Sequence, residues 1–368
     1  MKYYIITGEA SGDLHASNLI KELKKRDSKA DFRCWGGDLM QQQGVTLAKH
    51  YRELAFMGFV EVLLNIKTIL RNISFCKKDV LEYKPDVLIL VDYPGFNLKI
   101  AVWAKKMGIK VFYYISPQIW AWKQNRVYKI KRYVDKMFVI LPFEKDFYAK
   151  FNVEVDFVGH PLLDAIESRT ITPLDEFCKQ NNLIQKPIIA LLPGSRKQEI
   201  HTILPIMLSV IKNFPEYQFV VAGAPSQDRE FYQEYLSEQC VLLENKTYQL
   251  LEHSTAALVT SGTATLETAL FKIPQIVCYK ANFISFQIAK AVIKVPYISL
   301  VNLIADKELV KELIQKELNT IQLKSELTKL LEPIHRTQLL ADYDELQQKL
   351  GGVGASARAA DLMIRYLN

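Results

Sequence analysis

The sequence predicts an α/β protein with two doubly wound domains, each built on a parallel sheet. Short apolar runs alternate with helical stretches through most of the chain, and the alternation stops once, in a polar stretch at 167–187. The 368 residues also exceed what a single hydrophobic core usually serves. Uninterrupted aliphatic strands between helices are typical of a parallel sheet that is covered on both faces.

The first series of strands and helices predicts an N-terminal domain over 1–166. Its expected strands are the apolar runs 3–6, 86–91, 110–116, 137–141 and 155–159. A helix is expected after the first strand, because Leu14, Leu19, Ile20 and Leu23 recur at helical spacing. Another is expected from about Leu98.

A second series follows the linker at 167–187 and predicts a C-terminal domain over 188–334. Its expected strands are 188–192, 218–223, 240–244, 256–260 and 274–279. A helical segment is expected over 335–368. Ligands of doubly wound sheets bind beyond the carboxyl ends of the strands, so the loops after these strands are the places to look for chemistry.

Composition narrows the class of protein further. Apolar residues form 49% and charged residues 24% of the chain, as in ordinary globular proteins. The five cysteines lie apart with no C-x-x-C, which indicates reduced thiols in a cytosolic protein. No signal peptide is expected, and no apolar run reaches the roughly 18 residues that span a bilayer.

No metal site or cofactor is expected from the sequence. There is no P-loop motif, and the one D-x-D, Asp342 and Asp344, lies in the expected C-terminal helices, away from any strand end. The six histidines show no ligand spacing. His160 follows an expected strand, where a ligand contact and a role in the turn are equally plausible.

Basic and aromatic residues gather between Lys99 and Lys136. That window holds ten Lys or Arg and one acid, Asp135. The pattern suits nucleic acid, an anionic membrane surface or a phosphorylated substrate, and a solvated face with some buried rings explains it equally well.

The stretch LLPGSRKQEI, 191–200, has the features of an anion site. A buried strand ends at Gly194, Ser195 and Arg196, and a helix follows. Free backbone N–H groups at a helix start and a guanidinium fork both suit phosphate. Alternatively, Arg196 only pairs with Glu199 on the first helical turn.

The stretch VTSGTATLETA, 259–269, is a second candidate anion site. Ser261, Gly262 and Thr263 begin a helix, and small residues let the backbone approach a diphosphate closely. Glu267 lies one turn further on, where its carboxylate could accept hydrogen bonds from a ribose diol. A plain helix cap is the alternative. Two such sites in one domain favour a nucleotide diphosphate.

The loop after the first strand carries Glu9, Ser11, Gly12 and Asp13. It lacks G-x-G-x-x-G, and its acids would repel a pyrophosphate, so the loop fits the hydroxyls of a sugar better. We therefore assign these residues to acceptor binding. The alternative is a helix cap without a ligand.

The stretch VDYPGFN, 91–97, places Asp92 at the mouth of a buried strand, where a carboxylate has no packing role. Asp92 is the candidate general base that takes a proton from an attacking hydroxyl. A helix cap or a partner for a nearby lysine is the alternative. Asn97, on the same stretch, is counted with the acceptor-binding residues.

Taken together, GEASGDLH, AFMGFVEVL, DYPGFN, SPQIWAWKQNRVYKIK, LPFEKDFY, FVGHPLLD, LLPGSRKQEI and SGTATLE resemble the lipid-A-disaccharide synthase family. The matching motifs occur in order from residue 7 to about residue 310. SPQIWAW and LPFEKDFY are long and distinctive.

The resemblance implies a GT-B glycosyltransferase of Gram-negative bacteria. The family transfers 2,3-diacylglucosamine from UDP-2,3-diacylglucosamine to the 6-hydroxyl of 2,3-diacylglucosamine 1-phosphate. The reaction inverts the anomeric centre, forms the β-1,6 disaccharide of lipid A, releases UDP and needs no metal. Two alternative interpretations remain. One is another UDP-sugar enzyme of this fold, such as a 2-epimerase or a peptidoglycan-lipid transferase, and the other is a nucleic-acid-binding protein. We expect no nucleic-acid partner, because no recognised module is present; the oligomeric state is left open.

Residue by residue, the resemblance implies that Asp92 is the base and that Arg196 binds phosphate. It also implies that Glu267 and Asn302 contact the nucleotide. Some relatives have an acid before Phe-Asn, where this chain has Gly95, so this position supplies no second carboxylate.

Because both substrates of the family are acylated, the resemblance also implies a peripheral enzyme on the cytoplasmic face of the inner membrane. The stretch 56–73 is expected to form an amphipathic helix, with ordinary core as the alternative. Its expected lipid-facing residues are Phe56, Met57, Phe59, Val60, Leu63 and Leu64. Basic residues on and after it would gain about 1 kcal/mol each from anionic headgroups. These are Lys67, Arg71, Lys77 and Lys78.

Overall fold

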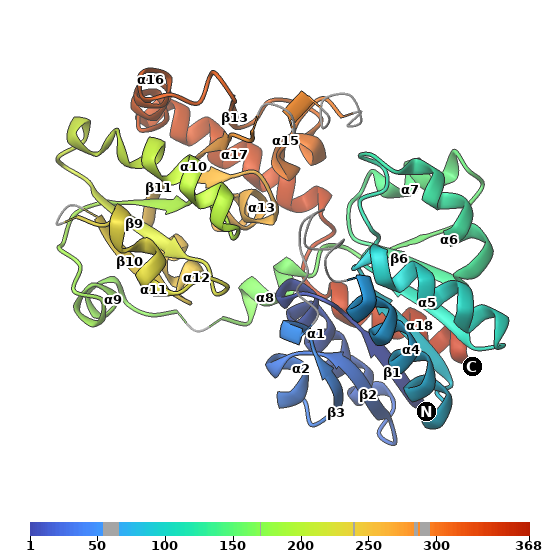
Figure 1. Ribbon diagram of the computed structural model, residues 1–368. Coiled ribbons are helices and arrows are strands. Elements are labelled where there is room, and N and C mark those ends of the chain that lie inside the picture. The colour runs from blue at the N-terminus through green and yellow to red at the C-terminus, as the bar shows by residue number, and fades with distance from the viewer. Residues whose placement is uncertain (54–65, 170, 238–239, 283–285, 288–294) are drawn as a thin grey trace. The chain divides into compact units, whose positions relative to one another are not determined.

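The computed structural model describes the whole chain except residues 54–65, 170, 238–239, 283–285 and 288–294 (Figure 1). The expected lipid-facing residues at 56–64 lie outside the described residues. The described chain forms two compact units, residues 1–168 with 350–368, and residues 169–349. Each unit is a parallel sheet with helices between successive strands, which confirms the predicted fold class.

The first unit contains a seven-stranded parallel sheet in the order β3-β2-β1-β4-β5-β6-β7. Its strands are β1 (Lys2–Ile6), β2 (Asp31–Gly36), β3 (Thr46–His50), β4 (Val87–Val91), β5 (Lys110–Tyr114), β6 (Lys136–Val139) and β7 (Asp156–Phe157). The strand order reverses between β1 and β4, which is the switch point where doubly wound sheets bind ligands. All five residues of β4 are buried, as its aliphatic run predicts.

Helices pack against both faces of this sheet. They are α1 (Ala10–Arg26), α2 (Asp38–Gln42), α4 (Ile66–Tyr83), α5 (Pro94–Lys106), α6 (Val127–Tyr133), α7 (Glu144–Ala149), α8 (Leu162–Glu167) and α18 (Ala355–Leu367), with the short 3-10 helices η1 (Tyr51–Glu53) and η2 (Gln124–Arg126). Contacts group α1 with α2, α8 and α18, and they group α5 with α4 and α6.

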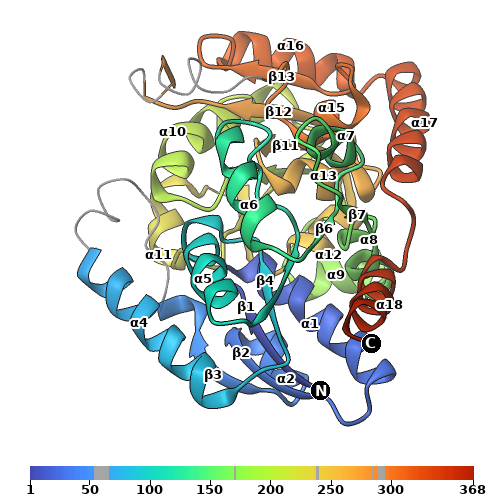
Figure 2. The ribbon, with the colours of Figure 1, turned by 90° about the vertical axis from the view of Figure 1, so that its right-hand side faces the viewer.

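The C-terminal helix α18 belongs to the first unit, where it lies beside α1 (Figure 2). Ala355, Ala359 and Met363 on one side of α18 are fully buried, and Arg26 of α1 pairs with Asp361. The sequence analysis expected one helical segment over 335–368; in the structure, 350–368 join the first unit and 335–349 the second. Helical periodicity marks a buried face but does not identify its partner.

The second unit contains a six-stranded parallel sheet in the order β10-β9-β8-β11-β12-β13. Its strands are β8 (Ile188–Leu192), β9 (Gln218–Gly223), β10 (Cys240–Glu244), β11 (Ser254–Thr260), β12 (Gln275–Tyr279) and β13 (Lys311–Ile314). Its helices are α9 (Leu174–Gln180), α10 (Lys197–Leu208), α11 (Arg229–Tyr232), α12 (Thr247–Glu252), α13 (Thr263–Leu270), α15 (Leu300–Ala305), α16 (Thr320–Leu330) and α17 (Pro333–Lys349), with η3 (Ile211–Asn213) and η4 (Gln233–Tyr235).

The two sheets end in loops that carry the candidate residues. Because every strand of a parallel sheet points the same way, the loops after β1 and β4 meet at one edge of the first sheet. The loops after β8 and β11 meet in the same manner in the second sheet. All five cysteines are buried and free. No helix in the described part of the chain is long and apolar enough to cross a bilayer.

Candidate active site

Asp92 leaves β4 through an unusual turn. Asp92 has φ of +43° and Tyr93 has φ of +50°, so two successive non-glycine residues adopt the left-handed conformation. Such residues are uncommon and persist where the surrounding structure holds them. Helix α5 begins at once with Pro94, whose fixed φ suits the first helical turn.

Two buried side chains stabilise this turn by donating hydrogen bonds to the carbonyl oxygen of Asp92. The oxygen accepts a hydrogen bond from Asn97 Nδ2 at 2.8 Å and another from the Tyr113 hydroxyl at 2.6 Å. Asn97 Nδ2 also lies 3.3 Å from the carbonyl oxygen of Ile6 and 3.2 Å from that of Val91. Asn97 is fully buried and ties the ends of β1 and β4 together. The amide nitrogen of Asn97 is engaged inside the unit, and the acceptor contact expected for Asn97 stays a prediction.

The carboxyl group of Asp92 has a strongly altered affinity for protons. Burial, and secondly the negative charge of Glu9, raise the pKa of Asp92 to about 7. Glu9 follows β1 and Asp92 follows β4, so the pairing of these two strands places the two acids in neighbouring loops. A general base is most effective when its pKa lies near the working pH.

The loop from Gly8 to Gly12 passes close to its neighbours. A Cβ at Gly8 would lie 2.5 Å from the ring of Tyr93, and a Cβ at Gly12 would lie 1.8 Å from Thr7 Oγ1. Only glycine fits at either position. Ser11 is exposed in the first turn of α1.

Asp13 acts inside the first unit. Its carboxylate accepts hydrogen bonds from the backbone N–H groups of Gly37 at 2.7 Å, Leu39 at 3.1 Å and Met40 at 3.1 Å. Only 2% of Asp13 is exposed. Asp13 therefore caps the start of α2, and not the start of its own helix α1 as the alternative to a sugar contact had it.

Arg196 lies between β8 and α10, beside Glu199. Its guanidinium nitrogen Nη1 is 3.3 Å from Glu199 Oε1, and its backbone N–H donates to Glu199 Oε2 at 3.4 Å. The pairing weighed as an alternative is thus present. The Arg196 side chain is 65% exposed, so this ion pair is weak and a phosphate can compete for the guanidinium. Gly194 has φ of +108°, and a Cβ there would lie 2.8 Å from Glu199 Oε2.

The loop after β9 supports the loop that carries Arg196. Ser226 Oγ and Gln227 Nε2 each donate to the carbonyl oxygen of Ser195 at 3.0 Å. Neither residue is among those expected from the sequence. No motif identifies them, because their role depends on β8 and β9 being neighbours in the sheet.

The start of α13 is open. Gly262 precedes the helix and has no side chain to cap its first N–H groups, and a Cβ at Gly262 would meet no atom within 4 Å. Ser261 Oγ donates to the carbonyl oxygen of Ile298 at 2.7 Å, so it does not serve as the cap. Gly262 and Thr263 are exposed. This open helix start has the geometry of an anion site.

Glu267 lies one turn into α13, and its Oε1 accepts a hydrogen bond from the Tyr248 hydroxyl at 2.9 Å. Burial raises the pKa of the Glu267 carboxyl above its ordinary value, and the hydrogen bond from Tyr248 opposes this. Tyr248 is also absent from the residues expected from the sequence.

Asn302 differs from the expected nucleotide contact. It is fully buried, and its Nδ2 donates to the carbonyl oxygen of Val310 and to Glu312 Oε1, both at 2.9 Å. Its Oδ1 accepts from the backbone N–H groups of Leu309 at 2.8 Å and Val310 at 3.0 Å. Both ends of the amide are therefore used in holding the loop between α15 and β13.

His160 has a role in a turn. It is buried, and its Nδ1 accepts from the backbone N–H of Leu162 at 3.3 Å. Its ring lies edge-on to that of His15, with 6.5 Å between the centroids. Burial and the neighbouring His15 lower the pKa of His160 to about 3, so the ring is neutral.

No three His, Cys, Asp or Glu side chains of the described ranges gather to hold a metal ion. The acids of the D-x-D are paired with lysines: Asp342 lies 2.8 Å from Lys307, and Asp344 contacts Lys272.

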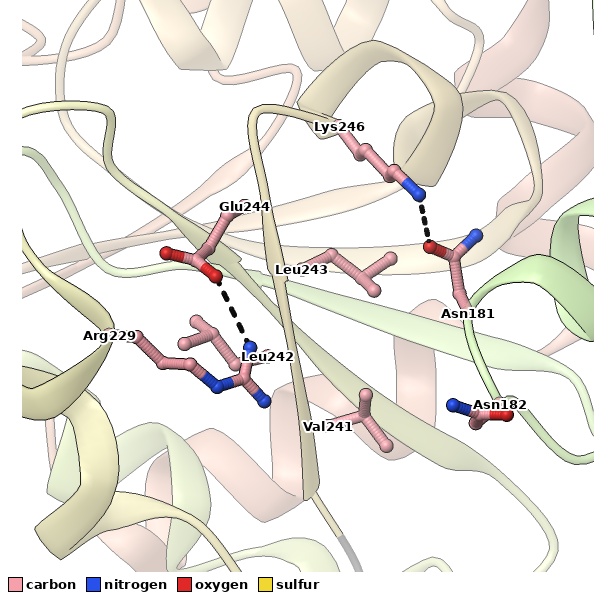
Figure 3. Close-up of a pocket in the computed structure, with 8 residues that line it drawn as sticks. All are labelled: Asn181, Asn182, Arg229, Val241, Leu242, Leu243, Glu244 and Lys246. Carbon is pink, nitrogen blue, oxygen red and sulfur yellow. Dashed lines mark hydrogen bonds and ion pairs between the residues drawn. The ribbon is translucent and has the colours of Figure 1, made fainter.

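A cavity of about 420 Å³ lies along the edge strand β10 (Figure 3). Arg229 Nη1 reaches Glu244 at 3.2 Å across it, and Lys246 Nζ donates to Asn181 Oδ1 at 2.6 Å. None of the candidate residues lines this cavity, so we do not assign it to the active site.

Solved structures of other proteins share this fold. MnaA of S. aureus in complex with UDP has a TM-score of 0.72 at 13% identity, with 100% of this chain and 97% of that chain covered. The calicheamicin glycosyltransferase CalG4 has a TM-score of 0.62 at 15% identity, with 100% of each chain covered. The fold is therefore the two-domain Rossmann-like α/β fold of GT-B glycosyltransferases and related epimerases.

Sequence comparison identifies the family. The model of the lipid-A-disaccharide synthetase family matches residues 3–362. The lipid-A-disaccharide synthase of Syntrophus aciditrophicus is 40% identical over 373 residues, covering 99% of this chain and 97% of the relative. The lipid-A-disaccharide synthase of Geobacter metallireducens is 36% identical over 371 residues, which cover 99% of this chain and 96% of that relative. The chain belongs to the lipid-A-disaccharide synthase family and is a glycosyltransferase that uses a UDP-sugar. This confirms the predicted family and disfavours a 2-epimerase.

Proposed function

We propose that this glycosyltransferase transfers 2,3-diacylglucosamine from UDP-2,3-diacylglucosamine to the 6-hydroxyl of 2,3-diacylglucosamine 1-phosphate. The products are the β-1,6-linked disaccharide and UDP. The family match over residues 3–362 carries the proposal, and the environment of Asp92 supports it.

On the donor side, the diphosphate of the UDP-sugar binds at the open start of α13 and at Arg196. Arg196 exchanges its exposed ion pair with Glu199 for the phosphate, where its planar fork can make two charge-assisted hydrogen bonds. As the anomeric C–O bond breaks, its electron pair passes to the leaving UDP. The guanidinium and the helix N–H groups stabilise that developing charge, and we propose that no metal ion takes part.

On the acceptor side, Asp92 removes the proton of the 6-hydroxyl while the hydroxyl oxygen attacks the anomeric carbon. One displacement inverts that carbon and leaves the proton on Asp92. The raised pKa of about 7 makes Asp92 a stronger base than an ordinary aspartate. The hydrogen bonds of Asn97 and Tyr113 to its carbonyl oxygen fix the turn on which the carboxylate sits.

Helix α4 supports peripheral binding to the cytoplasmic face of the inner membrane. Its outward face combines the exposed apolar residues Leu70, Phe75 and Leu81 with the exposed cations Lys67, Arg71 and Lys78. Apolar side chains beside cations are typical of helices that lie on anionic bilayers. Asp79 on the opposite face of α4 binds Arg33 Nε at 2.8 Å, which ties the helix to β2 of the sheet.

Replacement of Asp92 tests the assignment of the base. Asp92→Asn has nearly the same shape and cannot accept the proton, so we expect turnover to fall by at least about 100-fold, with UDP affinity by calorimetry unchanged. Arg196→Ala weakens both turnover and UDP binding. Near-normal turnover of Asp92→Asn, measured by mass spectrometry of the disaccharide, would remove Asp92 from the role of base.

A further inference from the structure

Tyr248 connects two helices of the second unit, through its hydroxyl group and through its aromatic ring. It lies at the start of α12, and its hydroxyl donates to Glu267 Oε1 on α13 at 2.9 Å. Its ring packs against Phe271, the C-cap residue directly after α13, with 5.3 Å between the centroids and 55° between the planes. Glu267 and Phe271 are four residues apart and so share one face of the helix. The ring contact therefore sets the direction of the hydroxyl.

Phe271 is itself fixed from another direction. The guanidinium carbon of Arg169 lies 4.8 Å from the centroid of the Phe271 ring, and Arg169 Nη2 lies 3.7 Å from Glu252 Oε1 at the end of α12. Tyr248 thus sits on a supported aromatic surface, and its hydroxyl has little freedom to leave Glu267.

The position of Glu267 relates this pair to the nucleotide. Glu267 lies four residues beyond Thr263, which is about 6 Å along the helix axis from the open N-terminus. That rise is comparable to the separation between the diphosphate of a nucleotide and its ribose. An ionised carboxylate only accepts hydrogen bonds, which suits the two donating hydroxyls of a ribose diol.

The hydrogen bond also bears on the charge of Glu267. Burial raises the pKa of Glu267, which favours the neutral acid, and the Tyr248 hydroxyl counteracts this by donating to the ionised form. Burial and the charge of Glu267 also raise the pKa of Tyr248, so its hydroxyl keeps its proton and remains the donor.

We propose that Tyr248 is a positioning residue for nucleotide selection, whose hydroxyl holds Glu267 so that the carboxylate binds the 2′- and 3′-hydroxyls of the ribose of a nucleoside diphosphate. This rests on the proposed function, in which the donor is a UDP-sugar. Beyond the proposed function, the enzyme distinguishes ribose from deoxyribose, and this selectivity depends on Tyr248 and Glu267 together rather than on Glu267 alone.

Calorimetry with UDP and 2′-deoxy-UDP, in EDTA, tests the proposal. The unaltered protein prefers UDP. Tyr248→Phe keeps the ring on Phe271 and removes only the hydroxyl, so its UDP affinity falls about tenfold and the preference for UDP nearly disappears. Affinity for 2′-deoxy-UDP falls less, because this nucleotide offers Glu267 only the 3′-hydroxyl. In turnover, the KM for the UDP-sugar rises and kcat is retained.

Three further variants separate positioning from general stability. Glu267→Gln also loses the preference, and the double variant with Tyr248→Phe loses no more than Glu267→Gln alone, because the two side chains act as one unit. Tyr235→Phe is the matched control. It removes a hydroxyl that lies 2.6 Å from His201 Nδ1 in the same unit, and it leaves both affinities unchanged.

Four results would overturn the inference. If Tyr248→Phe keeps the preference for UDP, its hydroxyl does not position Glu267. If it weakens UDP and 2′-deoxy-UDP equally, the role of Tyr248 is structural. If the unaltered protein binds both equally, the ribose contact itself is wrong while the proposed function stands; failure to bind UDP at all would instead overturn both.

Discussion

The raised pKa of Asp92 predicts how activity depends on pH. An ordinary aspartate is ionised throughout the range from pH 5 to 9, whereas burial and Glu9 raise the pKa of Asp92 to about 7. The ionised fraction of such a group is about one tenth at pH 6, half at pH 7 and nine tenths at pH 8. Since only the ionised form can accept a proton, kcat/KM falls about tenfold between pH 8 and pH 6.

The charge of Glu9 supplies the perturbation that tests this cause. Glu9→Gln removes a negative charge that opposes ionisation of Asp92, so the midpoint of the profile moves to lower pH. At pH 6 the variant therefore retains a larger fraction of its own maximal rate than the unaltered protein does. The assay is UDP release in detergent micelles at constant ionic strength from pH 5.5 to 8.5.

The acceptor phosphate titrates near pH 6 as well, but it does so identically with both proteins. The difference between the two midpoints therefore reports on Glu9 and Asp92 alone. A flat profile for the unaltered protein, or the same midpoint for both proteins, would refute the reasoning.

Three other predictions follow from the contacts of the described residues. Tyr113→Phe removes one of the two hydrogen bonds that hold the Asp92 carbonyl, and we expect kcat to fall about tenfold with UDP affinity unchanged; an unchanged kcat would show that Asn97 suffices. Gly95→Asp places a carboxylate in the first turn of α5, where its Cβ meets no atom within 4 Å. It should raise the free energy of unfolding by about 1 kcal/mol, and a lower melting temperature would contradict this. Asn302→Ala leaves buried polar groups unpaired and should lower the unfolding free energy in urea by about 3 kcal/mol. Loss of UDP binding at full stability would instead make Asn302 a nucleotide ligand.

The sequence predicts those strands whose residues are all buried. Strands β4 and β8 are wholly buried aliphatic runs, and their type and position follow from composition alone. Strands β2, β3 and β13 are not among the strands expected from the sequence. β3 and β13 form edges of their sheets and carry charged residues, so their pairing depends on a neighbour and not on their own pattern.

The site is predictable only in part, for a related reason. Ligands of doubly wound sheets bind beyond strand ends, so the loops that carry Asp92 and Arg196, and the helix start before Glu267, can be located from the sequence. Tyr113 and Tyr248 contact Asp92 and Glu267 from other elements, and these contacts appear only when the chain is folded.

The roles of some buried polar side chains cannot be predicted from the sequence. Asp13 and Asn302 stand at helix starts or loops, as ligand-binding residues do, yet their polar atoms are used by backbone groups of the same unit. A sequence does not separate the two roles, because both require a polar side chain beside a turn.

The most direct test of the proposed reaction is UDP release from UDP-2,3-diacylglucosamine in micelles that contain EDTA, with and without 2,3-diacylglucosamine 1-phosphate. We expect release only when the acceptor is present, with one disaccharide formed for each UDP. Release at the same rate without the acceptor, or loss of release on adding EDTA, would contradict a metal-free transfer to a lipid acceptor.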